Sequence, residues 1–309
     1  MQKTDYAPIA IFAYNRPDSL TRMMASLREC KEFEHSTITI FVDGPKNEKD
    51  KAAVDRVRHL VQNLRLPNVT NVFSETNKGL RQSIYSGVNE ICAGQGRVIV
   101  LEDDLVLSPI ALRYFNDGLD YYKDDVRIWS IAGYLYDVPE LRDSRKAIAL
   151  PFAHPWGWAT WARAWSRFSL DNRPRLTDLE SAAFCQMFDV NGIYPFAAQL
   201  QQSIAGRVDS WFIHWYYTIF QNGGWSIFPP RRVLDNFGIS QGTHGSALNP
   251  HEYLVERPTL LNEEVIFESM VSLNYAALDQ LKRCRELRVQ RFIATAGRAK
   301  RRLRALIKG

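Results

Sequence analysis

Three consecutive acids, Glu102-Asp103-Asp104, directly follow the apolar run Val98–Leu101. Such a run is typical of a buried strand, and open α/β sheets bind their ligands at the carboxyl ends of their strands. Adjacent carboxylates repel one another, and Mg²⁺ or Mn²⁺ relieves that repulsion while bridging to phosphate oxygens. The acids therefore predict a metal-dependent site for a nucleotide diphosphate. The alternative is a solvated acidic turn that caps a helix beginning near Pro109.

Further polar candidates follow the other short apolar runs. Asn15-Arg16-Pro17 comes after the first run and Asp43-Gly44 after the second, although each could be only a turn. Lys78 follows the third run and faces either phosphate or solvent. In the second half, Asp209 precedes an apolar helix predicted over Phe212–Phe220, a position that suits a helix cap in any protein.

The elements that position these residues read as βα units. The predicted strands are short and rich in β-branched or aromatic residues: Ile9–Ala13, Ile38–Val42, Val69–Phe73, Val98–Leu101 and Ile128–Ala132. In the segments between these strands, apolar residues recur at helical spacing. The predicted helices are Ser19–Lys31 with Asp18 as its cap, one that starts at Asn47, Gly79–Ala93 and Pro109–Tyr122. The pattern indicates an open, mostly parallel α/β sheet.

The composition changes after about residue 134, because seven of the eight tryptophans lie between Trp156 and Trp225. We expect residues 1–133 to bind the nucleotide, and residues 134–272 to form an acceptor-side half of the same domain. Residues 273–309 are expected to form a helical basic tail.

The tail is strongly charged. Residues 281–309 hold 11 Lys/Arg and one acid, a net charge of +10, which leaves −5 for the rest of a chain whose total is +5. A segregated basic end indicates an anionic partner, and interspersed apolar residues are compatible with an amphipathic helix on a membrane surface. A solvated helix and a nucleic-acid-binding arm remain alternatives.

No apolar stretch is long enough for a signal peptide or a membrane span. The four cysteines are far apart, so reduced thiols are expected rather than disulfides or a zinc site. Both observations favour a cytoplasmic protein, held peripherally at the inner face of the plasma membrane by its tail.

With the strand before it and Leu-Val-Leu-Ser-Pro after it, Glu102-Asp103-Asp104 resembles the EDD form of the DxD motif. That form occurs in the Golgi N-acetylglucosaminyltransferase family and is similar to motifs of bacterial family-2-like sugar transferases. The resemblance implies the GT-A fold, a Rossmann-like, mostly parallel sheet flanked by helices. It also implies that Asp104 binds Mn²⁺, Asp103 contacts ribose and Glu102 contacts the donor sugar.

Other segments resemble the family in the same order. Arg16 then contacts phosphate or nucleotide, Asp43 reads the base and Lys78 faces phosphate. His154-Pro-Trp-Gly157-Trp158 resembles the segment that lines the donor-sugar and acceptor side, although tryptophan clusters are also common in cores.

The resemblance extends to the late segments. Asp209 resembles the acid that deprotonates the acceptor hydroxyl. Asn236-Phe-Gly238 and Gly242-Thr-His244-Gly245 resemble a glycine-flanked loop that orders over bound donor, with His244 at the diphosphate or the metal. His244 could equally be structural.

The combined prediction is an inverting, metal-dependent hexosyl- or N-acetylhexosaminyltransferase that uses a nucleotide sugar, with UDP as the expected nucleotide. Its expected acceptor is a glycan or glycolipid of bacterial surface-polysaccharide biosynthesis, such as lipopolysaccharide. One alternative is a sugar-nucleotide nucleotidyltransferase, which the absence of glycine from Ala13–Pro17 disfavours. The other is a non-enzymatic module that binds anionic surfaces or nucleic acid; no nucleic acid is expected as a partner.

Overall fold

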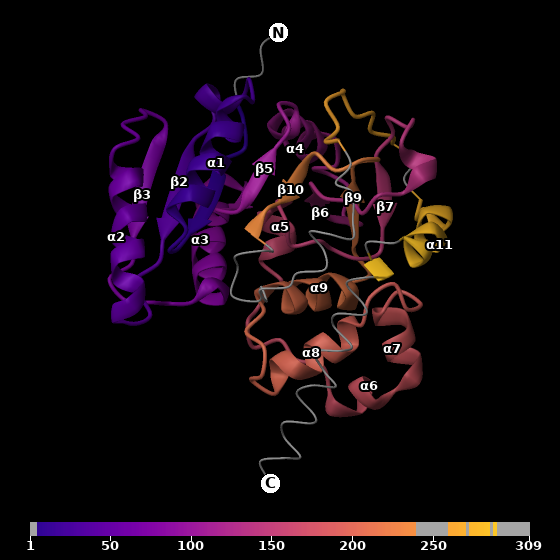
Figure 1. Ribbon diagram of the computed structural model, residues 1–309. Helices are drawn as coiled ribbons and strands as arrows, with labels where there is room; N and C mark the ends of the chain where they lie inside the picture. The colour runs from indigo at the N-terminus through magenta and orange to yellow at the C-terminus, as the bar shows by residue number, and fades with distance from the viewer. Residues whose placement is uncertain (1–4, 239–258, 270–271, 285–286, 289–309) are drawn as a thin grey trace.

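The computed structural model describes residues 5–238, 259–269, 272–284 and 287–288 of the 309-residue chain. Its strands are β1 (Ile9–Ala13), β2 (Ile38–Val42), β3 (Val69–Phe73), β4 (Arg97–Glu102), β5 (Leu105–Leu107), β6 (Ile128–Ala132), β7 (Ile148–Leu150), β8 (Trp158–Trp161), β9 (Trp225–Phe228) and β10 (Leu234–Asn236). Eight of them form one sheet in the order β3-β2-β1-β4-β8-β6-β9-β7, and β10 pairs with β5 in a second, small sheet (Figure 1). The predicted α/β class is confirmed.

The helices are α1 (Pro17–Arg28), α2 (Glu48–Gln62), α3 (Leu80–Gln95), α4 (Ala111–Tyr121), α5 (Ala162–Trp165), α6 (Leu176–Glu180), α7 (Ala182–Phe188), α8 (Phe196–Ile204), α9 (Trp211–Gln221) and α11 (Tyr275–Arg283). Short 3₁₀ turns lie at Phe33–His35 and Pro139–Leu141. Helices α6 to α9 gather below the sheet in the view of Figure 1.

The first half of the chain is built from parallel strands. β3, β2, β1 and β4 are neighbours in that order, and each pair is parallel. The β1 strand is buried over its whole length, as expected for a strand covered on both faces. The strands predicted at β1, β2, β3 and β6 have the predicted bounds.

Two helix starts test the predictions. The helix predicted to start at Asn47 begins one residue later, at Glu48, and Asn47 caps it, because its side chain accepts a hydrogen bond from the Lys49 N–H at 3.0 Å. The prediction for Asp18 is wrong. Pro17 already occupies the first helical turn of α1, so Arg16 is the cap residue and Asp18 lies inside that turn.

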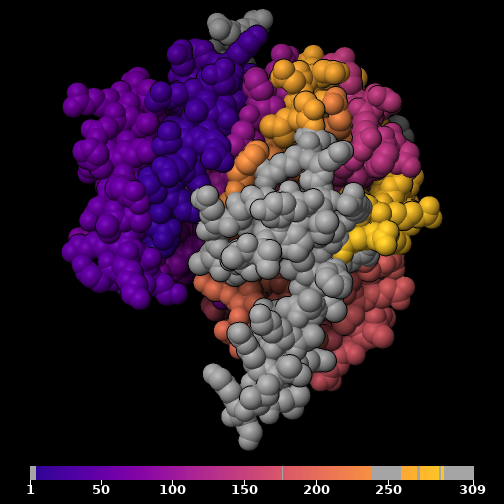
Figure 2. All heavy atoms as spheres, viewed as in Figure 1, coloured from indigo at the N-terminus to yellow at the C-terminus, as the bar shows by residue number. Residues whose placement is uncertain are grey.

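The second half continues the same sheet. β8 pairs antiparallel with β4 on one side and with β6 on the other, so the sheet runs without a break past residue 134. β9 is parallel to β6, and β7 is antiparallel to β9. Figure 2 shows the amino-terminal part, indigo to purple, on the left and the later part of the chain, magenta to orange, on the right.

The predicted C-terminal helix begins as α11, which Asn274 caps by accepting a hydrogen bond from the Ala277 N–H at 2.9 Å. Most of the basic tail lies outside the described residues, so its membrane role stays a prediction. No helix of the described residues is long and apolar enough to cross a membrane. The four cysteines are free thiols.

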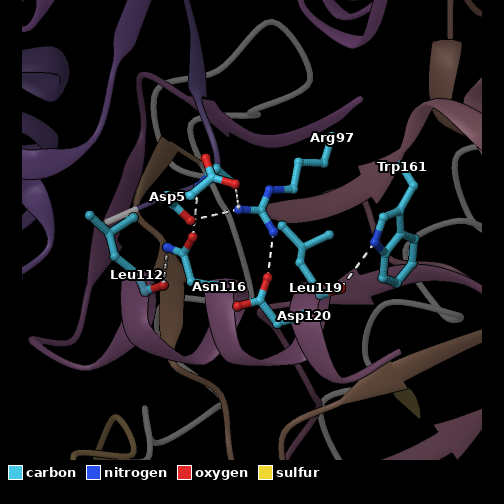
Figure 3. Close-up of polar contacts among 8 residues, drawn as sticks. Asp5, Arg97, Leu112, Asn116, Leu119, Asp120 and Trp161 are labelled. Atoms are coloured by element: carbon cyan, nitrogen blue, oxygen red, sulfur yellow. Dashed lines mark hydrogen bonds and ion pairs between the residues drawn. The ribbon is translucent and has the colours of Figure 1, made fainter. Parts of the chain in front are cut away.

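The amino end of β4 is fixed by polar contacts (Figure 3). Arg97 binds the carboxylate of Asp120 and donates to the carbonyl and the carboxylate of Asp5 at 2.6 and 3.1 Å. Nearby, the Asn116 side chain accepts from the Ala7 N–H at 2.8 Å. These contacts tie the segment before β1 to β4 and α4.

Candidate active site

The predicted nucleotide-binding residues lie at one edge of the sheet. β2, β1 and β4 are adjacent and parallel, so the segments that follow them emerge side by side. Arg16 follows β1, Asp43 follows β2 and Asp103 follows β4. This is the edge at which open α/β sheets bind ligands.

Arg16 binds both aspartates of the acid cluster. Its Nη1 donates to Asp104 Oδ2 at 2.8 Å, and its Nη2 donates to Asp103 Oδ1. The backbone N–H of Tyr14 donates to the other oxygen of Asp103 at 3.2 Å. The Arg16 side chain is 25% exposed, whereas those of Asp103 and Asp104 are only 2% and 9% exposed. One partly exposed guanidinium therefore faces two nearly buried carboxylates.

The acid cluster carries more negative charge than Arg16 compensates. Burial, followed by the charges of Asp104 and Asp103, raises the pKa of Glu102 to about 8 although Arg16 lowers it. Burial also raises the pKa of Asp103 to about 6, again against the effect of Arg16. Additional positive charge at this edge would therefore be stabilising.

The late segment Asn236–Gly238 closes the cluster from the other side. β10 pairs antiparallel with β5, which places Asn236 opposite Leu105. The Asn236 amide donates to Asp104 Oδ1 at 3.1 Å and accepts from the Gly238 N–H at 2.8 Å. Asp104 is thus held by Arg16 on one oxygen and by Asn236 on the other.

Gly238 leaves no room for a side chain. A Cβ atom there would lie 2.1 Å from Asp104 Oδ2 and 2.7 Å from Arg16 Nη1. From the sequence, Asn236 and Gly238 were visible only as parts of a loop similar to that of the family. Their direct contact with the acid cluster had no local signal, because it depends on the pairing of β10 with β5.

Asp43 organises the loop after β3. Its Oδ1 accepts from the N–H groups of Gly44 and Lys78, both at 2.9 Å. Its Oδ2 accepts from the Asn77 amide at 3.1 Å and from the Gly79 N–H at 2.9 Å. The backbone of Lys78 is therefore fixed while its side chain is exposed. Base recognition by Asp43 and phosphate contact by Lys78 remain predictions.

Asp209 lies against this same loop. A Cβ atom on Gly79 would be 3.6 Å from Asp209 Oδ2. The cap of α9 is Ser210, whose side chain accepts from the Ile213 N–H at 3.4 Å, so the capping alternative for Asp209 is wrong. Asp209 is exposed, and its carboxylate accepts no hydrogen bond within the described ranges.

The surroundings of Trp158 do not support a contact with the donor sugar. Its side chain is 1% exposed and packs against Trp211, Trp165 and Trp215, with ring centroids 5.3, 5.4 and 6.0 Å away. The position of Trp158 is therefore explained by core packing, which was the alternative to sugar contact for the tryptophans. β8 lies between β4 and β6, so neighbouring strands cover both of its edges.

Gly157, predicted to line the donor site, has a packing role in the structure. Its φ is +56°, and a Cβ atom there would lie 2.1 Å from Leu234 Cδ2. The Gly157 carbonyl accepts from the Gly133 N–H at 2.8 Å. Gly157 thus lets the segment before β8 approach β10, next to Asn236.

The carboxylates fit a divalent cation that binds together with a diphosphate. Within the part of the chain that the structure describes, no group of three or more His, Cys, Asp or Glu side chains is arranged to hold a metal alone. Mg²⁺-type sites at phosphates, however, typically use one or two carboxylates, with phosphate oxygens and waters as the other ligands. Asp104 can supply such a carboxylate. His244, the other predicted ligand, lies outside the described residues.

Comparisons of the whole structure find similar folds among glycosyltransferases of the GT-A type. The mannosyltransferase PcManGT from Pyrobaculum calidifontis, in complex with GDP-Man and Mn²⁺, is 11% identical, with 72% of each chain covered and a TM-score of 0.41. GalNAc-T7 with UDP, GalNAc and Mn²⁺ is 12% identical, with 82% of this chain and 48% of that chain covered and a TM-score of 0.46. No protein-family model and no curated protein matches. At TM-scores this low, the function of the chain has to be inferred from its own side chains.

Proposed function

We propose that the chain is a metal-dependent glycosyltransferase that moves a sugar from a nucleotide diphosphate to an acceptor hydroxyl. The observation that carries this proposal is the acid cluster at the carboxyl edge of the sheet, where Arg16 is the only cation that pairs with Asp103 and Asp104 among the described residues. A divalent cation would compensate the remaining negative charge, and a diphosphate bound with it would offer oxygens that Arg16 can bind.

In this proposal Asp104 holds the cation, Asp103 contacts the ribose and Glu102 contacts the donor sugar. The cation supplies charge that stabilises the departing diphosphate. Arg16, which is 25% exposed, would bind the phosphate oxygens. Asp43 holds the loop at residues 77–79 in place, and Lys78 on that loop offers a second cation for the phosphates.

Asp209 is the general base of the proposed reaction. Its exposed carboxylate has no competing hydrogen bond in the described parts of the chain, so it can accept a proton from the acceptor hydroxyl. The acceptor oxygen then bonds to the anomeric carbon as the bond from that carbon to the diphosphate breaks, and the diphosphate leaves with the bonding electrons. A single displacement of this kind inverts the anomeric configuration.

The finer assignments extend the proposal. We expect a hexose or N-acetylhexosamine on UDP as the donor, and a glycan or a lipid-linked sugar of bacterial surface polysaccharide as the acceptor. The net charge of +10 on residues 281–309 supports attachment to an anionic membrane surface beside a lipid-linked acceptor.

Donor binding is tested by thermal unfolding with UDP-, GDP- and CMP-linked sugars, each with and without Mn²⁺. We expect one nucleotide class to raise Tm only when Mn²⁺ is present. The rise should disappear in Asp104→Ala and persist in Asp120→Ala, which changes an acid at the other end of β4. If no nucleotide sugar stabilises the wild type, the proposed function is wrong.

The role of Asp209 is separated from that of its neighbour by two variants. Asp209→Asn should abolish sugar transfer while leaving Tm and donor binding unchanged. Ser210→Ala removes the cap of α9, which should cost about 1 kcal/mol of stability without abolishing transfer. Full turnover by Asp209→Asn would exclude it as the base.

A further inference from the structure

A cavity of about 140 Å³ lies in the second half of the molecule. Its walls come from the segment that follows β7, from the residues leading into α8, from α8 itself and from the first turn of α9. The lining residues are Tyr136, Phe152, Ala153, His154, Pro155, Trp156, Ile193, Tyr194, Phe196, Gln199, Phe212 and Leu287. An enclosed cavity of about 150 Å³ accommodates benzene. This cavity is partly open to solvent, so one face of a six-membered ring can enter it while the ring's substituents stay outside.

The walls are mainly aromatic and mutually packed. Trp156 meets the His154 ring edge-on with centroids 5.0 Å apart, and Tyr136 meets the same ring at 5.5 Å. On the α8 side, Tyr194 and Phe196 have centroids 5.0 Å apart. Aromatic faces bind the C–H faces of sugar rings as well as other aromatic groups.

The described part of the cavity wall carries no charged side chain. Among the described residues that line it, none is Asp, Glu, Lys or Arg. His154 is neutral, because burial and then the charge of Arg232 lower its pKa to about 3. Its Nδ1 accepts from the Trp156 N–H at 3.3 Å, which leaves the proton on Nε2, 3.4 Å from the Tyr136 hydroxyl. The described lining residues therefore offer a charged ligand no counter-ion.

One polar group in the wall is available to a ligand. The Gln199 side chain lines the cavity, is partly buried and makes no hydrogen bond to the described residues. A hydrocarbon in the cavity would leave this amide without a partner, which is unfavourable, whereas a ring with hydroxyl groups satisfies it. The combination favours a neutral sugar over an apolar chain or an aromatic ring.

Two of the lining residues belong to segments that lead to the proposed reaction centre. Phe212 lies in the first turn of α9, three residues after Asp209, and α8 packs against α9 (Figure 1). Trp156 precedes Gly157, which packs on Leu234 of β10, and the same strand carries Asn236 to Asp104. The cavity is therefore built in part from segments that connect to the proposed base and to the proposed donor site.

We propose that this cavity binds one uncharged pyranose ring of the acceptor, packed on the aromatic walls and hydrogen bonded through a hydroxyl to Gln199. The assignment of this sugar as the acceptor rests on the proposed function, whereas the prediction that the cavity binds a neutral sugar does not. It assigns the acceptor to neutral glycans and excludes uronic and sialic acids from this position.

The test is saturation-transfer NMR on the full chain, without nucleotide or metal. The probes are the methyl glycosides of galactose, glucose, mannose and N-acetylglucosamine, with methyl glucuronide and benzyl alcohol as charged and apolar-ring comparisons. We expect at least one neutral glycoside to bind. Gln199→Ala should weaken it about tenfold, the effect of one lost hydrogen bond. Gln201→Ala, an amide on the same helix outside the cavity, should leave it unchanged.

The other outcomes overturn the proposal. Binding of benzyl alcohol alone would make the cavity an apolar-ring site, and preferred binding of glucuronide would contradict its neutral character. An absence of glycoside binding, or binding that Gln199→Ala and Trp156→Ala both leave intact, would place the sugar elsewhere. This experiment contains no donor, so an absence of glycoside binding would not affect the Mn²⁺-dependent donor test. If instead the donor test fails and a glycoside binds, the cavity is a sugar site without a role in sugar transfer.

Discussion

Strand β4 has one arginine bound to two aspartates at each of its ends, and the two arrangements are opposite in burial. At the amino end the Arg97 side chain is only 15% exposed, while Asp5 and Asp120 are 92% and 41% exposed. At the carboxyl end the acids are nearly buried and Arg16 is the more exposed partner. At the first end water solvates the acids. At the second end the acids are shielded from water, and a bound cation would compensate their charge, which is why we assign ligand binding to that end.

The largest difference between the ends should appear in activity. Replacing Asp104 by Asn removes the proposed metal carboxylate and should lower sugar transfer by at least about 100-fold. Asp120→Asn, at the other end, should stay within about twofold of the wild type, because it weakens only a solvated ion pair. The measurement is turnover of the donor identified by thermal shift. Equal losses in the two variants would show that the ends do not differ in function.

The second-largest loss of activity is expected from disturbing the close packing around Gly238 at the carboxyl end of β4. Gly238→Ala would place a methyl group 2.1 Å from Asp104 Oδ2, so Asp104 or the loop must move. A displacement of this size in a catalytic group typically costs about 10- to 100-fold in rate.

The matched control for that variant is Gly94→Ala, since a Cβ atom on Gly94 meets nothing within 4 Å and the residue lies inside α3. This substitution should preserve turnover and slightly raise Tm. Normal activity in Gly238→Ala would mean that the position of Asp104 is not critical.

The uncompensated charge at the carboxyl end predicts a pH dependence of stability. The pKa of Glu102 is 4.5 in the unfolded chain and about 8 in the folded protein. Below the lower value both states are protonated and the full contribution to stability is present. As the pH rises towards about 8, the unfolded state loses its proton first, so the folded state is progressively destabilised.

In EDTA, the Tm of the wild type should therefore fall by a few degrees, relative to that of Glu102→Gln, between about pH 5 and pH 8. Mn²⁺ with the donor should reduce this difference. Parallel pH profiles for the two proteins would show that Glu102 is already compensated in the folded state.

The smallest effects are expected at the amino end. Arg97→Met should cost about 1 kcal/mol of unfolding free energy, as expected for partly exposed ion pairs, and should leave the Mn²⁺-dependent donor shift intact. Arg16→Met makes the same change at the carboxyl end and should abolish that shift. The free energy of unfolding from chemical denaturation and the donor-induced change in Tm are measured for both variants and compared. Loss of the donor shift in Arg97→Met would remove the distinction between the ends.

The parts of the fold that the sequence predicted are those with local signals. β1 and β6 were predicted to the residue because each is a short, fully buried apolar run. The α1 cap was misplaced because Asp18 is a good cap by residue type, while Pro17 had already fixed the first turn. The acid cluster could be placed at a strand end because its strand was recognisable.

Other features of the site depend on contacts between distant segments. Trp158 gives the same sequence signal on a sugar platform and in a core, and only its packing against tryptophans of α5 and α9 identifies it as a core residue. β5 and β10 are three residues each, too short for a periodic pattern, so the contact of Asn236 with Asp104 was not predictable from sequence. The separation of Asp209 from the cap of α9 depends on backbone geometry that two neighbouring polar residues do not reveal.

The hydrogen bond between Asn236 and Asp104 joins residues 132 positions apart, which has a consequence for synthesis on the ribosome. The four parallel strands β1 to β4 are complete once residue 102 has emerged. β5 cannot pair until β10 has been made, so Asp104 lacks its bond to Asn236 for another 132 residues of synthesis. Because non-local pairing is slow to form, the binding edge is finished well after the four parallel strands, and a nascent chain that already holds those strands cannot yet hold its ligand.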